Sequence, residues 1–214
     1  MRELLEQKMA RFIAFLGLFI IVAGLAGLVY YQAYHLPKER EQNEKLWVAM
    51  LELDQNNFQD ALYGTEEFYG LEAISHGYSW AKSTKLAKYL AGVASMKMKK
   101  YPETIEYLEG LSFDYDLLNV MTYTVLADAY TFEDQTNLAI DRYNKAFVLA
   151  YDKYPQFAYL PANKLAAAYI FQEKYKDALK IYDELLSLEE TLSEHVDLLA
   201  DIHARRAGVM TMLH

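Results

Sequence analysis

The side chains that could perform catalysis or bind a metal are sparse and scattered. Five histidines are spread along the chain, at His35, His76, His195, His203 and His214. On one helix His195 and His203 would lie about two turns apart, too far to bind one metal without a third ligand from elsewhere. The acidic neighbours either diverge on a helix or lack companion ligands for calcium: Glu66 with Glu67, Glu189 with Glu190, and Asp114 with Asp116. These residues therefore predict no metal site.

Enzyme motifs are missing from the sequence as well. The chain contains no GxGxxG, GxxxxGK[ST], GxSxG or HExxH pattern. It also contains no cysteine, which excludes a disulfide framework, a thiolate metal site, a cysteine nucleophile and a lipoprotein anchor on an N-terminal cysteine. The sequence thus predicts a protein that is not an enzyme and needs no cofactor.

The composition is typical of a folded helical protein. Acidic residues outnumber lysine and arginine by 30 to 21, which gives a formal net charge of -9, so nucleic acid is not an expected partner. Nineteen tyrosines argue against disorder, and only 9 glycines and 4 prolines argue against an all-β chain with many tight turns. We therefore expect an ordered, all-α protein.

The elements that position these residues begin with an apolar N-terminal segment. Residues 12–31 contain no charge and would form a helix roughly 30 Å long, which matches the hydrocarbon core of a bilayer. Tyr30, Tyr31 and Tyr34 follow where interfacial aromatic residues belong. We predict a cytoplasmic tail over 1–11 and a single transmembrane helix over 12–34, in contact with membrane lipid.

Sequence leaves the processing and the orientation of this helix open. Gly24 and Ala26 would precede a possible signal-peptide cut, although a secretory apolar region is usually shorter, about 7 to 15 residues. The positive-inside count is a tie, because three basic residues lie on each side: Arg2, Lys8 and Arg11 before it, and Lys38, Arg40 and Lys45 after it. A short basic tail before one long apolar run is usual for an uncleaved signal anchor, and we expect a cytoplasmic N-terminus.

Small residues in the predicted membrane helix favour packing against another helix. Ala14, Gly17 and Gly24 lie near one face, and Ala23 with Gly27 forms a small-x-x-x-small pair on a neighbouring face. Small side chains let helix backbones approach closely in lipid, so these residues predict contact with another membrane protein. The alternative is that glycine and alanine are simply common in membrane helices.

Beyond this helix the sequence predicts a short tether over 35–45 and then further helices. Pro37 is expected to interrupt the helix. No Gly/Ser linker precedes the apolar periodic segment that starts at Leu46, so the soluble domain should lie close to the membrane. Apolar residues recur at intervals of three and four, as between Leu86 and Val93, and no convincing strand run is present.

Four segments of the soluble part repeat one pattern. They read LWVAMLELDQNNFQDAL, YLAGVASMKMKKYPETI, VLADAYTFEDQTNLAI and KLAAAYIFQEKYKDAL. Each contains a helix, a turn and a second helix whose small or polar marker residue falls at Ala61, Thr104, Ala139 and Ala178. The markers are 43, 35 and 39 residues apart, against about 34 for a tetratricopeptide repeat, with the excess assigned to loops.

In these segments the chain resembles the tetratricopeptide repeat (TPR) family. The small residue of the family's first helix matches Ala49, Gly92, Ala127 and Ala166, and its first-helix tyrosine matches Tyr130 and Tyr169. A small residue stands there because two antiparallel helices cross too closely for a larger side chain. Thr104, Glu52 and Ser95 depart from the pattern, so the first two units match less well. A generic helical bundle is the alternative.

The resemblance implies a TPR-like α-solenoid of about four units over 46–190. Residues 66–80 form an insertion that lengthens the first unit. Residues 191–214 place Leu199, Ile202, Met210 and Leu213 on roughly one face and are expected to form a C-terminal capping helix. The predicted fold class is all-α, with a single N-terminal transmembrane helix followed by this solenoid.

In the TPR family the concave surface is lined by first-helix positions at fixed offsets from the small residue. Transferring these offsets gives a candidate protein-binding groove of Leu46, Met50, Leu53, Leu86, Tyr89, Val93, Met96, Met121, Thr124, Asp128, Thr131, Leu160, Asn163, Ala167 and Ile170. This mostly apolar set disfavours the carboxylate-clamp mode of some family members. An apolar groove with flexible methionines suits an amphipathic helix or a non-native chain segment. The alternative is that the capping helix fills the groove.

The whole architecture is similar to that of the bacterial YfgM-like proteins, which also combine one anchor, a short tether and an acidic TPR domain. This resemblance implies an ancillary subunit of the Sec translocon in the bacterial inner membrane. Its periplasmic TPR domain would meet a nascent polypeptide and a membrane-anchored chaperone. The alternatives are a structural scaffold for another cell-envelope assembly or secretion machine, and a cleaved, freely secreted repeat protein.

Overall fold

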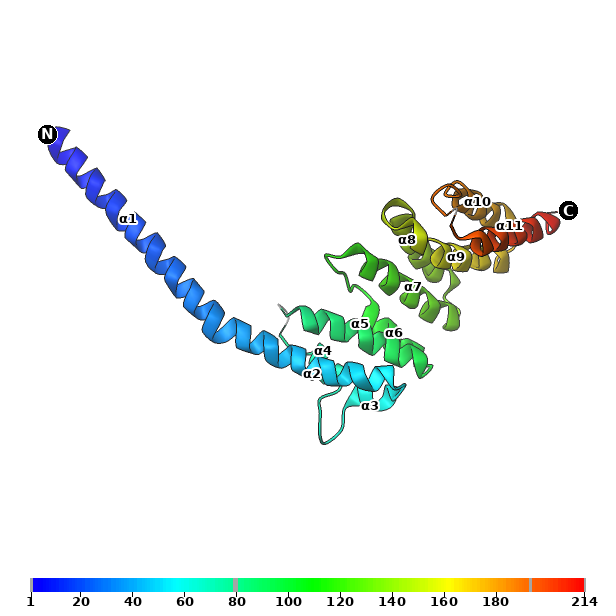
Figure 1. Cartoon of the computed structure of the whole chain (residues 1–214), viewed down its shortest axis with the longest axis horizontal. Helices are drawn as coiled ribbons and strands as arrows, with labels where there is room; N and C mark the ends of the chain where they lie inside the picture. The colour runs from blue at the N-terminus through cyan, green and yellow to red at the C-terminus, as the bar shows by residue number, and fades with distance from the viewer. Residues whose placement is uncertain (1, 79–80, 193, 214) are drawn as a thin grey trace.

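The computed structural model describes residues 2–78, 81–192 and 194–213, apart from the side chains of residues 2–8, 10, 11 and 14. Within these ranges the regular elements are helices, and the one β-contact is an isolated bridge between Gly64 and Tyr69. Figure 1 shows a long N-terminal helix followed by helix pairs that stack along a curved path. The expected all-α fold, one apolar N-terminal helix before a solenoid of paired helices, is confirmed.

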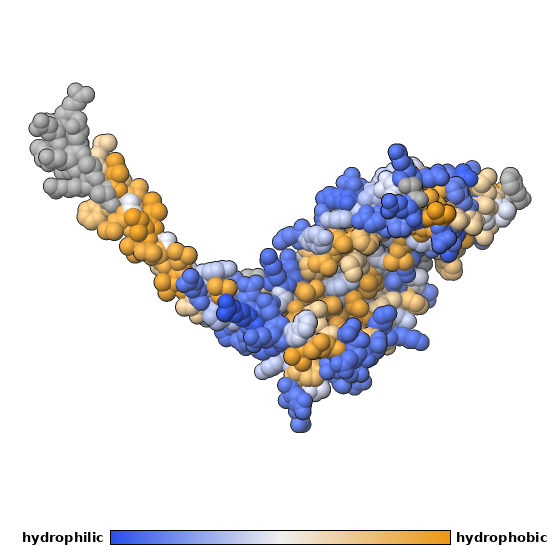
Figure 2. Space-filling view, in the orientation of Figure 1, coloured by the Kyte–Doolittle hydropathy of each residue, from blue (hydrophilic) through white to orange (hydrophobic). Residues whose placement is uncertain are grey.

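The N-terminal helix runs without a break into the soluble domain. Helix α1 (Arg2–Tyr30) passes through a π-helical turn (Tyr31–His35) into α2 (Leu36–Asp54). This rod is long and apolar enough to span a membrane, and none of its apolar window is buried against the rest of the protein. In Figure 2 the coloured part of α1 is apolar, hydrophilic residues begin where the helix meets the body, and the body shows both hydrophilic and apolar surface.

The expected interruption at Pro37 is wrong, because the helix continues through this residue. Proline lacks an N–H, which leaves a carbonyl in the preceding turn without its usual partner. The preceding turn is widened instead, and the Leu36 N–H donates to the Tyr31 carbonyl in the π-helical pattern. The chain therefore bends here and does not stop (Figure 1), so residues 35–45 are helical.

Helix pairs, beginning with α2, make up most of the described chain after α1. The pairs are α2 with α3 (Phe58–Tyr63), α5 (Lys82–Lys97) with α6 (Tyr101–Leu108), α7 (Asp116–Phe132) with α8 (Thr136–Lys153), and α9 (Tyr159–Phe171) with α10 (Tyr175–Leu186). The short α4 (Leu71–Ser75) lies in the expected insertion, and a 3-10 turn η2 (Pro155–Phe157) leads into α9. Helix α11 (Val196–Thr211) packs against α10 at the end of the stack.

One turn geometry joins the two helices of each pair. Asn56, Lys99, Asp134 and Glu173 all have φ between 57° and 63°. In each turn the next N–H donates to the carbonyl five residues earlier, as from Lys100 to Ser95 at 2.8 Å. This is the Schellman ending of a helix, at a position usually taken by glycine. Each of these residues stands five positions before the marker residue, so the repeat register of the sequence is present in the backbone.

The small residues that mark the repeats lie buried where the helices cross: Ala49, Ala61, Gly92, Thr104, Ala127, Ala139, Ala166 and Ala178. Of the described glycines that lie in helices, Gly92 has the least space for a side chain. A Cβ there would lie 2.6 Å from the Leu108 side chain, so α5 and α6 cross closely at this point. Thr104, the departure from alanine, donates its hydroxyl to the Lys100 carbonyl at 3.1 Å and to the Gly92 carbonyl at 3.3 Å. The missing side chain at Gly92 thus gives space to larger residues on α6.

Among the described residues, two clusters of buried side chains form the core. One includes Leu62, Leu71 and Ile74 and belongs to the first two pairs, while the other extends from α5 to α11. Leu86 and Leu90 pack against both clusters. The pairs are therefore joined by a continuous core, on which the open surfaces described next are built.

Candidate functional site

An apolar cavity of about 420 Å³ lies where the first helices of successive pairs meet. Its walls come from α5, α7, η2, α9 and the start of α11, and include Tyr89, Met121, Thr124, Phe157, Leu160 and Leu198. Met121 is 44% exposed, Phe157 47% and Leu160 55%, so apolar surface reaches solvent at its rim. Apolar side chains also gather over the middle helices in Figure 2. We call this site the apolar cavity.

Four of the predicted groove residues line the apolar cavity: Tyr89, Met121, Thr124 and Leu160. Tyr89 and Thr124 are buried, whereas Met121 and Leu160 are exposed. These residues come from the first helices of three successive pairs, α5, α7 and α9. This agrees with the fixed offsets that were used to predict the groove. The structure therefore brings the middle part of the predicted groove together in space.

The remaining predicted groove residues lie elsewhere. Those that belong to the core clusters or pack against them are Leu46, Met50, Leu53, Leu86, Val93 and Ile170. Met96 is half-buried, and the Asn163 Oδ1 accepts a hydrogen bond from the Tyr182 hydroxyl at 2.9 Å. Most of these side chains stabilise contacts within and between the pairs and leave little surface for a ligand.

Residues outside the predicted set complete the apolar cavity. Phe157 comes from η2 and Leu198 from α11, while Tyr159 and Pro161 come from the first turn of α9. The offset rule missed them because it considers one helix of each unit and no connecting segment. The signal in the sequence is the aromatic pair Phe157 and Tyr159 immediately before a first helix.

Helix α11 borders the apolar cavity without filling it. Ile202 and Val209 are buried in the core with residues of α10, and Leu198 is the α11 residue that reaches the cavity. The Tyr159 hydroxyl donates to Asp201, which also accepts from Arg205 at 2.7 Å. These contacts hold α11 at the end of the stack, so the alternative in which the capping helix occupies the groove does not apply to this cavity.

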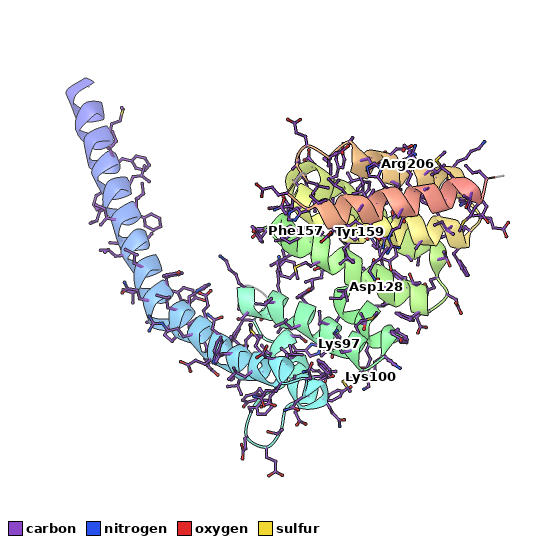
Figure 3. The ribbon with its side chains drawn as sticks, turned by 45° about the vertical axis from the view of Figure 1, so that its right-hand side comes forward. Lys97, Lys100, Asp128, Phe157, Tyr159 and Arg206 are labelled. Atoms are coloured by element: carbon purple, nitrogen blue, oxygen red, sulfur yellow. The ribbon has the colours of Figure 1, made fainter. Side chains whose placement is uncertain are left out.

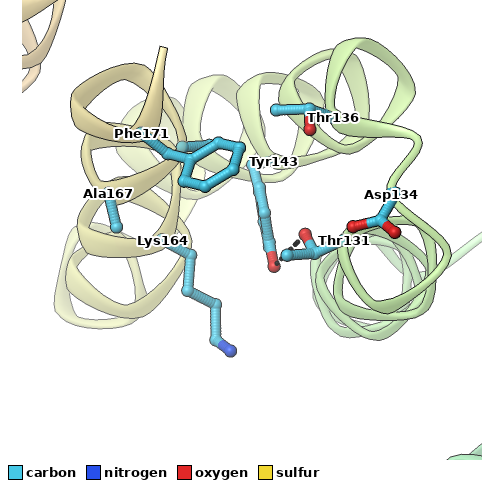
Figure 4. Close-up of a pocket in the computed structure, with 8 residues that line it drawn as sticks. Thr131, Asp134, Thr136, Tyr143, Lys164, Ala167 and Phe171 are labelled. Atoms are coloured by element: carbon cyan, nitrogen blue, oxygen red, sulfur yellow. Dashed lines mark hydrogen bonds between the residues drawn. The ribbon is translucent and has the colours of Figure 1, made fainter. Parts of the chain in front are cut away.

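A second cavity, of about 320 Å³, lies between the later halves of the same helices. Figure 4 shows Thr131 and Asp134 at the end of α7, Tyr143 on α8, and Lys164, Ala167 and Phe171 on α9 around it. Phe171 is 78% exposed. Two further predicted groove residues, Thr131 and Ala167, therefore line a distinct site, which we call the polar-aromatic cavity.

A hydrogen-bond network centred on Asp128, also a predicted groove residue, borders the polar-aromatic cavity. Its Oδ1 accepts from the Tyr143 hydroxyl at 2.5 Å and from the Lys164 ammonium at 2.7 Å. Burial, and then the neighbouring Asp128 charge, raise the pKa of Tyr143 well above its ordinary value. Tyr143 therefore remains a protonated donor at neutral pH, and the charge of Lys164 is balanced by Asp128.

Small residues line part of α1. Gly17, Ala23, Gly24 and Gly27 are exposed, and a Cβ added to any of the three glycines would meet no atom within 4 Å apart from the backbone of its own helix and its chain neighbours. The side chain of Ala14 lies outside the described residues. The predicted packing face of α1 is thus accessible to a neighbouring helix.

The described residues place no group of three or more His, Asp or Glu side chains where they could hold a metal ion. His195 and His203 are both exposed. The cavities present apolar surface, hydrogen-bonding groups and charges that suit non-covalent binding.

Comparison with known proteins defines the fold. No family model and no curated protein matches the chain. It is similar to the crystal structure of a Podosopora anserina protein described as a kinesin light chain with nearly identical TPR-like repeats: the TM-score is 0.56 at 14% identity, over 82% of this chain and 92% of that chain. A point variant of that protein gives a TM-score of 0.58 at 15% identity, with the same coverage. The fold is therefore a TPR-like helical repeat.

Proposed function

We propose that the protein is a non-enzymatic, membrane-anchored interaction protein whose TPR-like domain binds a segment of another polypeptide. The observation that carries this proposal is the apolar cavity, at which Met121, Phe157 and Leu160 of the folded domain are exposed to solvent. Apolar concavities with a few polar groups are typical binding sites, and a methionine can adapt to ligands of different shape. Helix α1 anchors this site at the bilayer.

Within this class we propose an ancillary subunit of the bacterial Sec translocon, as the similarity to the YfgM-like proteins implies. Residues 1–11 are then cytoplasmic, residues 12–34 cross the inner membrane, and the repeats over 46–190 with the cap over 191–214 lie in the periplasm. The exposed small residues of α1 support packing against a partner's membrane helix. The apolar cavity would receive a nascent polypeptide or part of a membrane-anchored chaperone.

Site-specific photocrosslinking in living cells tests both contacts. A photoreactive residue at Gly24 should crosslink to a translocon component, and one at Leu160 to a polypeptide or chaperone. The matched control is Val148, which is 56% exposed on α8 and does not line either cavity. Adducts from Gly24 that contain another envelope complex and no translocon subunit would refute the Sec assignment. Crosslinking from Leu160 no stronger than from Val148 would refute the binding role of the cavity.

A further inference from the structure

The two cavities follow one another along the same pair of helices. Met121 and Thr131 mark the two sites on α7, and Leu160 and Phe171 mark them on α9. Met121 and Thr131 are ten positions apart on α7, which corresponds to about 15 Å along the helix. A ligand lying along α7 and α9 therefore meets an apolar site and, about 15 Å further on, a site of different chemistry.

The order of the two sites is fixed relative to the anchor. Figure 3 places Phe157 and Tyr159 on the side of the solenoid that faces α1, whereas Asp128 lies further from α1 along α7. Phe157 and Tyr159 belong to the apolar cavity, whereas Asp128 borders the polar-aromatic cavity. The apolar cavity is thus the anchor-facing one of the two.

The polar-aromatic cavity has the chemistry of a site for a basic side chain. In the described part of the chain, the exposed Asp134 carboxylate makes no hydrogen bond or ion pair, and the exposed ring of Phe171 makes no aromatic contact. Among the described residues that line the cavity, the cation is Lys164, which is paired with Asp128 at 2.7 Å. A free carboxylate and an open aromatic face are both groups that attract Lys and Arg.

We infer that this surface selects a partner segment in which an apolar stretch lies about 15 Å from a basic side chain. The apolar stretch occupies the apolar cavity, and the basic side chain lies between Asp134 and Phe171. This inference rests on the proposed function and adds to it the charge and spacing of the bound segment. The formal net charge of -9 complements such a segment and favours its approach.

A peptide series measures the charge preference. We would titrate the full-length protein in nanodiscs with fluorescent amphipathic helical peptides. Each peptide carries an apolar stretch and, ten positions from it, a test residue that is Lys, Gln or Glu. The test residue is placed on the N-terminal side of the apolar stretch in one set of peptides and on the C-terminal side in another. The Lys peptide should bind most tightly, and each step to Gln and Glu should weaken binding about two- to fivefold. The differences should shrink at high salt, because solvent screens exposed charges.

A charge swap assigns the preference to Asp134. The variant Asp134→Lys should reverse the order of the three peptides, and its backbone is compatible with lysine because Lys99 occupies the corresponding turn with a similar φ. The control Asp54→Lys makes the same charge change at an exposed position in the first pair and should preserve the order. Phe171→Ala should weaken the Lys peptide more than the Gln peptide.

The outcomes separate this inference from the proposed function. If the three peptides bind equally well, or Asp134→Lys leaves their order unchanged, the charge selection is refuted while apolar binding stands. If none of them binds better than a polar scrambled peptide, the proposed function itself fails. Should Asp134→Lys lose its helical circular dichroism, Asp134→Asn serves instead and should abolish the difference between the Lys and Glu peptides.

Discussion

At the residue scale, the sizes of a few side chains decide how closely the helices of a pair approach. Gly92 is the clearest case, since a Cβ there would lie 2.6 Å from atoms of the Leu108 side chain, too close for an ordinary contact. Helix propensity alone would favour alanine at this position. The crossing of α5 with α6 overrides that preference.

We predict that Gly92→Ala destabilises the domain by about 1 to 3 kcal/mol, because the added methyl overpacks the crossing against Leu108. The matched control is Gly208→Ala in α11, where a Cβ would meet no atom within 4 Å apart from the backbone of its own helix and its chain neighbours. This control should be neutral or stabilise by up to about 1 kcal/mol. Urea unfolding followed by circular dichroism measures both, and equal effects at the two glycines would contradict the steric explanation.

The second residue-scale prediction concerns pH. An unfolded tyrosine ionises near pH 10, whereas burial and Asp128 raise the pKa of Tyr143 in the folded protein. The folded state therefore holds this proton more tightly, and the associated stability is present below about pH 10 and is lost as the pH rises above it. The free energy of unfolding should fall above pH 10.

The variant Tyr143→Phe should show a shallower fall between pH 10 and 11 than the unmodified protein. It should also lose about 1 kcal/mol or somewhat more at pH 8, since a hydrogen bond to a charged acceptor is removed. The control Tyr115→Phe changes a ring that is 56% exposed. If both variants show the same pH slope, Tyr143 does not cause the alkaline loss.

At the element scale, the turns within the pairs carry backbone strain that the sequence does not relieve. In each of the four turns described above, the residue at the same position has a positive φ and is not glycine. Asparagine and aspartate tolerate this conformation better than lysine and glutamate do. The stacking of the pairs therefore stabilises turns that are locally unfavourable at Lys99 and Glu173.

We predict that Lys99→Gly and Glu173→Gly each stabilise the domain by about 0.5 to 1 kcal/mol, because glycine adopts positive φ at little steric cost. The same change inside a helix should have the opposite sign. Lys88→Gly, at an exposed position in α5, should therefore destabilise by roughly 0.5 to 1 kcal/mol. Thermal unfolding of the three variants measures whether each substitution raises or lowers stability. If both turn variants lose stability, the turns are not strained as proposed.

At the scale of the whole molecule, one continuous helical rod links the apolar segment to the solenoid. The π-helical turn and Pro37 bend this rod (Figure 1), so the bend sets the direction in which the solenoid leaves α1. Because residues 35–45 are helical, the two parts are connected by a stiff element with a bend. Anchoring α1 in a bilayer would consequently fix the position of both cavities more closely than a flexible linker would.

The whole-molecule prediction is the topology. The chain has no cysteine, so single cysteines report unambiguously. With the N-terminus in the cytoplasm, Asn43→Cys should react with an impermeant maleimide in intact spheroplasts, and Glu3→Cys only after lysis. The reverse pattern would place the repeats in the cytoplasm. An intact mass that lacks the first 26 residues would instead reveal a cleaved signal peptide.

Local patterns in the sequence determined the all-α class, the apolar N-terminal helix and the repeat register, because helix periodicity and small residues at crossings are properties of neighbouring positions. The offsets transferred from the TPR resemblance predicted Met121 and Leu160 as groove residues, and both line the apolar cavity. Tertiary structure alone decided that Phe157 and Leu198 complete the apolar cavity, that Leu46 is buried, and that Asp128 pairs with a lysine 36 residues away. The physical reason is that exposure depends on how the pairs stack around their insertions and connecting turns, and no single repeat contains that information.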